Sequence, residues 1–120
     1  MAMRVLVKAM KALSDETRLR TLNLLLEREC CVCEVIQALG ISQSTASRGL
    51  SALYDAGFLK QRREGLWAFY SIDRDKPQGF YSPLIDALGK ALKDDRVLQA
   101  DRDRLRQLRP VISRRTATTR

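Results

Sequence analysis

Three cysteines stand within four consecutive positions, at Cys30, Cys31 and Cys33, and they are the side chains best suited to chemistry in this chain. The cluster is too tight for a disulfide framework and indicates metal or redox chemistry in a reducing compartment. Thiolates prefer soft, thiophilic ions, and a site built from cysteine alone disfavours Mg, Ca and Mn. The sequence therefore predicts a site for a soft metal or metalloid at these three residues.

The chain contains no histidine, which narrows the choice of ion further. A closed tetrahedral zinc site needs a fourth ligand, and the cysteines of one chain cannot supply it. Trivalent arsenic or antimony binds sulfur in a trigonal arrangement and matches the number of thiols. Two other interpretations stay open: Cys30 and Cys33 form a C-x-x-C pair that can respond to oxidation or persulfide, and free cysteines also serve as small buried apolar residues.

Apolar residues at helical spacing predict the elements that position this cluster. Helices are expected over residues 3–13, 15–29, 32–39 and 43–56. Ser14 and Ser42 are the expected N-caps of the second and fourth helices, and Gly40 is the expected stop of the third. The cysteines thus lie at the start of the third helix, which a tight turn separates from the fourth. This arrangement is typical of a helix-turn-helix.

After Phe58 the apolar pattern changes to a period of two, which predicts a β-hairpin over residues 59–63 and 66–72. A further helix is expected after Pro83, interrupted near residues 94–95. The predicted fold is mainly α-helical with a β-hairpin, a winged helix-turn-helix. We assign residues 1–110 to this DNA-binding and dimerisation domain.

The outer face of the fourth helix is polar and rich in hydrogen-bond donors, as a helix that enters the major groove must be. The hairpin adds two arginines that can reach the DNA backbone or the minor groove. The predicted DNA contacts are Gln43, Ser44, Thr45, Ser47 and Arg48 on the helix, with Arg62 and Arg63 on the hairpin.

A net charge of +8, from 22 Lys and Arg against 14 Asp and Glu, favours a polyanionic partner. Residues 96–120 hold eight arginines and two aspartates, so much of the surplus lies near the C-terminus. We expect residues 111–120 to be a basic, disordered tail. Because no apolar run is long enough to cross a bilayer and no leader pattern opens the chain, we expect a cytoplasmic protein.

Several segments closely resemble the ArsR family of metalloregulatory repressors, in order and in spacing over most of residues 3–92. They are residues 13–25, 31–34, 40–50, 55–59 and 62–67. The resemblance implies a homodimer in which the first and last helices of two chains pack together, so that two recognition helices face a two-fold operator. One departure is Gly49, where members of the family often carry His.

The Cys31-Val32-Cys33 run is similar to the Cys-Val-Cys motif of arsenic-responsive members. The resemblance implies that Cys31 and Cys33 are ligands, with Cys30 as the third candidate, and that As(III) or Sb(III) releases the repressor from its operator. Residues i and i+2 lie about 200° apart on a regular helix. We therefore expect ligand binding to unwind the first turn of the third helix and misalign the recognition helix.

Two other classes of protein compete with this prediction. A thiol redox enzyme would need features that this sequence lacks. The C-x-x-C pair has no strand-helix-strand unit around it, and the sequence offers no histidine base and no Gly-rich cofactor loop. We therefore expect no enzymatic activity. An architectural DNA-binding protein, in which the cysteines are incidental, would keep its regulation when Cys31 and Cys33 are replaced by Ser.

Overall fold

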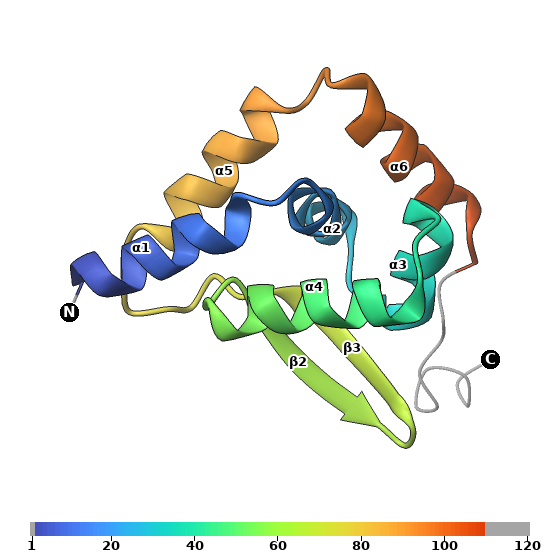
Figure 1. Ribbon diagram of the computed structural model, residues 1–120, viewed down its shortest axis with the longest axis horizontal. Coiled ribbons are helices and arrows are strands. Elements are labelled where there is room, and N and C mark those ends of the chain that lie inside the picture. The colour runs from blue at the N-terminus through green and yellow to red at the C-terminus, as the bar shows by residue number, and fades with distance from the viewer. Residues whose placement is uncertain (1, 110–120) are drawn as a thin grey trace.

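The computed structural model describes residues 2–109, so the predicted basic tail lies outside the described residues. The elements in chain order are α1 (Ala2–Leu13), α2 (Glu16–Glu27), β1 (Cys30–Cys31), α3 (Val32–Leu39), α4 (Gln43–Asp55), β2 (Leu59–Glu64), β3 (Trp67–Ile72), α5 (Tyr81–Ala91) and α6 (Arg96–Gln107). The helices α3 and α4 with the β2–β3 hairpin form a winged helix-turn-helix, which confirms the predicted fold class (Figure 1).

The centre of the molecule is α2, which Figure 1 shows end-on with other helices around it. Five consecutive residues of this helix, from Thr21 to Leu25, are buried, so it has no solvated face in that stretch. Its buried polar groups are hydrogen-bonded: Thr21 Oγ1 donates to the carbonyl of Thr17 at 2.9 Å, and Asn23 Nδ2 donates to the carbonyl of Leu98 at 3.1 Å.

The hairpin belongs to a three-stranded antiparallel sheet of order β1-β3-β2. The strand β1 consists of two cysteines, with Cys30 opposite Tyr70 and Cys31 opposite Phe69. Sequence analysis did not predict this strand, because two residues are too few to show an alternating pattern. The pairing joins the cysteine segment directly to the wing.

Two helix boundaries differ from the sequence prediction. Asp15, and not Ser14, is the N-cap of α2: its carboxylate accepts a hydrogen bond from the backbone N–H of Arg18 at 2.9 Å. Ser14 instead donates its hydroxyl to the carbonyl of Lys11, in the last turn of α1. The helix α2 also ends at Glu27, because the chain must become extended before it pairs in β1.

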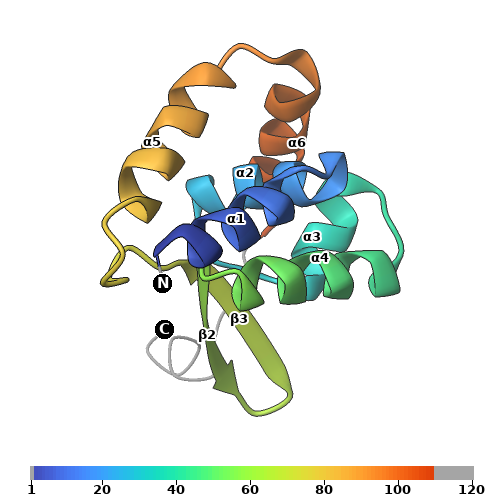
Figure 2. The ribbon, with the colours of Figure 1, turned by 60° about the vertical axis from the view of Figure 1, so that its left-hand side comes forward.

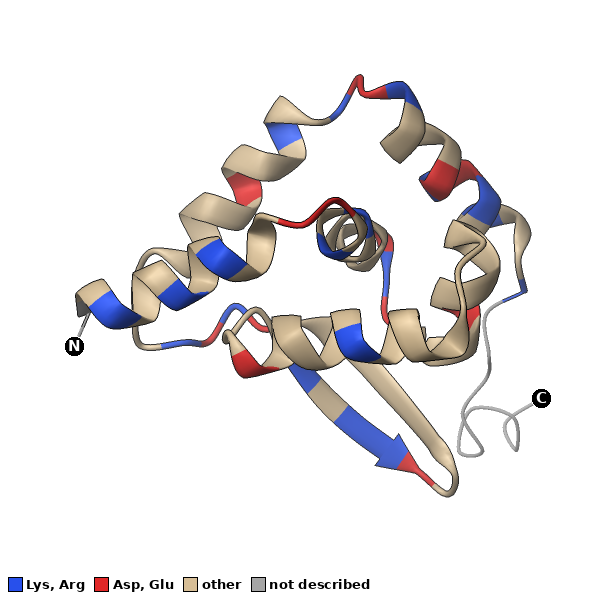
Figure 3. Ribbon diagram, in the orientation of Figure 1, with Lys and Arg blue, Asp and Glu red and all other residues tan. Residues whose placement is uncertain are grey.

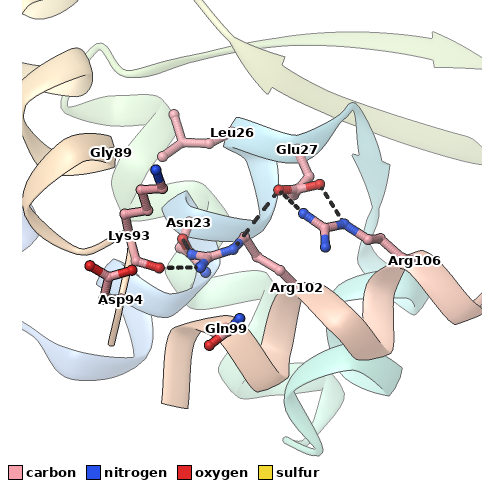
Figure 4. A pocket seen from close by; sticks show the side chains of 9 residues that line it. All are labelled: Asn23, Leu26, Glu27, Gly89, Lys93, Asp94, Gln99, Arg102 and Arg106. Atoms are coloured by element: carbon pink, nitrogen blue, oxygen red, sulfur yellow. Dashed lines mark hydrogen bonds and ion pairs between the residues drawn. The ribbon is translucent and has the colours of Figure 1, made fainter. Parts of the chain in front are cut away.

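The chain breaks near residues 94–95, as expected, and α6 starts anew with Asp95 as its N-cap. This helix docks on α2 and α3 through a fully buried carboxylate, Asp101, which pairs with Arg20 at 2.8 Å and with Arg104. Figure 4 shows a second set of contacts, in which Arg102 and Arg106 of α6 reach Glu27 of α2. Three arginines of α6, Arg102, Arg104 and Arg106, are thus engaged within the protomer.

At the other end of the molecule, α1 carries apolar side chains that the protomer leaves uncovered. Met3, Leu6, Val7 and Met10 are between 39% and 72% exposed. The helix α5 lies at the same end, and its Ile85 is buried in the core (Figure 2). Within the described part of the chain, no helix combines the length and the apolar character needed to cross a membrane.

Candidate functional site

The cysteine segment runs from the end of α2 through β1 into α3. Successive residues of a strand point to opposite faces, and here Cys30 is fully buried in the hydrophobic core. Its thiol donates to the carbonyl of Arg28 at 3.4 Å. Burial, followed by the nearby Glu34 carboxylate, raises the pKa of Cys30 to about 12. Cys30 is therefore a neutral core thiol in this structure.

Cys31 has a different position, because it is the N-cap of α3 with an extended backbone. It forms a capping box with Glu34: the Cys31 sulfur accepts from the backbone N–H of Glu34, and the Glu34 carboxylate accepts from the backbone N–H of Cys31 at 2.9 Å. Arg28 holds the same carboxylate at 2.9 Å. Sequence analysis missed this box, since the familiar signature begins with Ser or Thr.

Cys31 and Cys33 lie two residues apart at the start of α3. Burial, and after it hydrogen bonding with Cys33, raises the pKa of Cys31 to about 12. The expectation that a ligand unwinds the first turn of α3 stays a prediction, although it assumed that both cysteines lie inside a regular helix, whereas Cys31 precedes the helix as its N-cap. The N-cap position gives Cys31 an extended backbone, while Cys33 lies within α3.

These two cysteines line an open pocket of about 400 Å³ between the start of α3, the start of α4 and the wing. Figure 1 shows α3 beside the N-terminal end of α4, with the hairpin below. The full lining is Cys31, Val32, Cys33, Ile36, Gln43, Ser47, Leu66, Trp67 and Ala68. Two cysteines, side chains of the predicted recognition helix and side chains of the wing therefore line the same pocket.

A three-sulfur site fits this geometry poorly. Cys30 lies in the core and does not line the pocket that Cys31 and Cys33 share. Among residues 2–109, no group of three Cys, Asp or Glu side chains is arranged to hold a metal ion. The structure thus places two of the three predicted ligands on one pocket, and the third, Cys30 of β1, in the hydrophobic core.

The predicted DNA contacts on α4 lie along one polar face. Gln43, Ser44 and Arg48 are exposed, and Thr45 and Ser47 are half-buried. The expected N-cap is confirmed, since the Ser42 hydroxyl accepts from the backbone N–H of Thr45 at 3.2 Å. The opposite face packs inward through Ala46, Gly49, Leu50 and Leu53.

Gly49, the departure from the family pattern, lies on that inward face. A Cβ at this position would be 3.7 Å from Thr21 Oγ1 and 3.8 Å from Arg18 Cγ, both ordinary contact distances. The missing side chain therefore faces α2, and it is not among the exposed groups that can reach a groove.

The two hairpin arginines, Arg62 and Arg63, both belong to β2, much of which is coloured as basic in Figure 3, but they differ sharply in their surroundings. Arg62 pairs with Glu29 at 2.8 Å and with Glu64, and its guanidinium lies 4.4 Å from the centre of the Phe69 ring. Arg63 is exposed and forms no ion pair with any described residue. Sequence analysis missed Glu29, because nothing in the sequence pairs residues 29 and 62.

The comparisons with known proteins agree with this architecture. The model of the family described as "Bacterial regulatory protein, arsR family" matches residues 15–61. The chain is 42% identical over 85 residues to the arsenic resistance transcriptional regulator ArsR1 of Pseudomonas putida, a match that covers 70% of this chain and 62% of that protein. The chain thus spans less than two thirds of the length of that curated relative.

Two solved structures have a similar fold. HlyU from Vibrio cholerae matches with a TM-score of 0.66 and 28% identity, over 76% of this chain and 95% of that one. The homodimeric winged helix-turn-helix DNA-binding domain of Mb0332 from Mycobacterium bovis, described as a possible ArsR-family regulator, matches with a TM-score of 0.62 and 32% identity, over 78% and 82%. From its matched helix-turn-helix and these relatives, the chain belongs to the arsR family of bacterial regulatory proteins.

Proposed function

We propose that this protein is a homodimeric, DNA-binding transcriptional repressor that leaves its operator when trivalent arsenic binds at Cys31 and Cys33. The observation that carries the proposal is the shared pocket, in which the two thiols and the first turns of α4 are walls of one cavity. The similarity to the arsenic resistance transcriptional regulator ArsR1 of Pseudomonas putida supports arsenic as the inducer. Antimony(III) has similar thiophilic chemistry and is expected to substitute.

DNA binding is assigned to the exposed face of α4 and to Arg63 on the wing. An operator read by two recognition helices needs a dimer, with half-sites about one turn of DNA apart. The uncovered apolar residues of α1 supply a surface for a second copy, beside α5. The homodimeric state of the Mycobacterium bovis domain supports this assembly. We expect the protein to act in the cytoplasm, where thiols stay reduced.

The coupling between ligand and DNA follows from the walls of the pocket. A ligand held by Cys31 and Cys33 lies beside Gln43 and Ser47, which are needed in the major groove. Binding also engages the sulfur that caps α3, and so loosens the helix against which α4 is set. A coupling free energy of about 1–3 kcal/mol, typical of allosteric proteins, would lower operator affinity roughly 5- to 150-fold.

A second candidate is a repressor that responds to thiol oxidation. The closeness of Cys31 and Cys33 favours it, since a disulfide or persulfide at this pair would alter the same pocket. The C-x-x-C pair named from the sequence, Cys30 with Cys33, is less well placed, because Cys30 is buried in the core.

The test is operator affinity of the reduced full chain, with an operator selected from a random DNA pool at fixed salt. Arsenite is expected to weaken binding, whereas zinc is not. Cys31→Ser and Cys33→Ser should abolish the arsenite response and keep DNA binding. Cys30→Ser is the matched control and should keep the response.

Each alternative has its own outcome. Loss of binding with the thiol oxidant diamide alone would replace arsenic sensing by redox sensing. A response that depends on Cys30 as strongly as on the other two cysteines would restore the three-sulfur site. Unchanged binding under all conditions would refute regulation through the cysteines.

A further inference from the structure

The cysteine segment and the wing share one row of residues across the sheet. Cys31 of β1 is opposite Phe69 of β3, and Phe69 is in turn opposite Arg62 of β2. Neighbouring strands lie 4.7–4.9 Å apart, so the backbones at Cys31 and Arg62 are separated by only about 10 Å. A displacement of β1 therefore acts close to the outer strand of the wing.

The side chain of Arg62 spans this row and reaches back to the cysteine segment. Its guanidinium lies over the Phe69 ring, 4.4 Å from the ring centre. It donates to both carboxylate oxygens of Glu29, from Nε at 3.0 Å and from Nη2 at 2.8 Å. A bidentate pair of this kind fixes orientation as well as distance. Glu29 directly precedes β1, so the pair fastens β2 to a segment with which it shares no strand pairing.

The exposure of the pair indicates which property it serves. The side chains of Arg62 and Glu29 are 43% and 35% exposed. Ion pairs at the surface add little to stability, so loss of this pair should leave the fold intact. Its geometry instead sets the position of β2, on which the next residue, Arg63, is exposed.

We propose that the Glu29–Arg62 ion pair transmits ligand binding at the thiols to the wing. The inference rests on the proposed function and names the residues that couple its ligand to its DNA. A ligand held by Cys31 and Cys33 displaces β1 and the adjoining Glu29. The bidentate contact carries this displacement to Arg62, and so moves Arg63 away from its DNA contact. Glu29 and Arg62 are positioning residues, and neither binds the ligand.

The experiment measures a coupling ratio, defined as operator affinity without arsenite divided by operator affinity with saturating arsenite. Anisotropy of labelled operator on the reduced full chain gives both values. Because the ratio is taken within one variant, it cancels a change in DNA binding itself. Glu29→Gln removes the charge at nearly constant shape and should lower the ratio at least threefold, while native mass spectrometry shows the arsenite adduct unchanged.

Glu64→Gln is the matched control. Glu64 pairs with the same arginine, but it belongs to β2 itself and makes no link to the cysteine segment. This variant should keep the coupling ratio of the unmodified protein. An equal fall in Glu64→Gln, or an unchanged ratio in Glu29→Gln, would overturn the inference.

A double-mutant cycle tests whether Glu29 and Arg62 act as one unit. Arg62→Gln should lower the coupling ratio by the same factor as Glu29→Gln, and the double variant should lower it no further, because each change removes the same interaction. Effects that multiply in the double variant would assign the two residues to separate routes and contradict the proposal.

Failure of this inference can be told apart from failure of the proposed function. Loss of coupling only in the Glu29 and Arg62 variants requires that the unmodified protein responds. A response to diamide alone would refute arsenic sensing, and the ratio measured with diamide should then fall in Glu29→Gln as it would with arsenite, in support of the pair. Release of the unmodified protein by neither reagent would overturn both.

Discussion

Arg62 and Arg63 are neighbours on β2 with the same side chain and different partners. Arg62 is held by two carboxylates and an aromatic ring, so its charge is already compensated within the protein. Arg63 is exposed and forms no ion pair in the described part of the chain. A cation without an ion pair contributes more to phosphate binding than one that must first break an ion pair within the protein. The sequence does not distinguish the two arginines, because the ion pair of Arg62 with Glu29 joins residues that are far apart in the chain.

This difference predicts unequal effects on DNA binding. Arg63→Ala should lower operator affinity and reduce the slope of log affinity against log salt by about 1, as expected for the loss of one phosphate contact. Arg62→Ala should change the slope by less than half as much. Anisotropy titrations at several salt concentrations measure both. Equal slopes for the two variants would show that the ion pair between Arg62 and Glu29 breaks when the protein binds DNA.

The helix α6 holds α3 in position. Arg104 donates to the carbonyl of Ala38 at 2.7 Å, and Arg20 donates to that of Leu39 at 3.3 Å, so two cations cover the last carbonyls of α3. The buried carboxylate of Asp101 holds both arginines in place. The position of the thiol-bearing helix thus depends on a helix that starts more than fifty residues later.

Removing that carboxylate should be costly. Asp101→Ala leaves two arginines without their buried partner, and should lower the free energy of unfolding by about 2–4 kcal/mol, less than for a fully buried pair because both arginines reach solvent. Asp103→Ala, the same change at an exposed ion pair of the same helix, should cost about 0.5 kcal/mol or less. Urea unfolding measures both. Similar urea midpoints of unfolding for the two variants would contradict the role of Asp101 in holding α6 against α3.

The elements were predictable to different degrees. The pattern of α3, Gly40, Ser42 and α4 is local, and the structure has it as expected. The strand β1 and the docking of α6 depend on partners distant in the sequence, and local spacing does not reveal such partners. The same limit applies to the site: the sequence showed the cysteines, but only the fold separates Cys30 from the other two.

For the whole molecule, the main open surface is the apolar face of α1. Val7 on α1 is 46% exposed and Val97 on α6 is 54% exposed, so the two valines are a matched pair on different helices. The buried side chains of α6 are Leu98, Asp101 and Leu105, which pack inside the protomer. We therefore expect α1 with its neighbour α5 to form the dimer, which departs from the expectation that the first and last helices pair, since the last helix is α6.

Val7→Glu should shift the protein from dimer to monomer and weaken operator binding, because a charge would be buried at the contact between copies. Val97→Glu should leave the dimer intact. Size-exclusion chromatography with light scattering gives the mass of each variant. Dissociation by Val97→Glu, with Val7→Glu still dimeric, would move the dimer contact to α6.

The position of the pocket between α3, α4 and the wing also has a consequence for how the number of protein copies affects the response of the controlled genes. If the proposed function holds, one cavity serves the ligand and borders the face proposed to read DNA, and each partner must weaken the other by the same factor. A copy seated on its operator holds the arsenical less tightly than a copy free in solution. Surplus copies are therefore filled first, and their number sets the dose at which the controlled genes begin to respond.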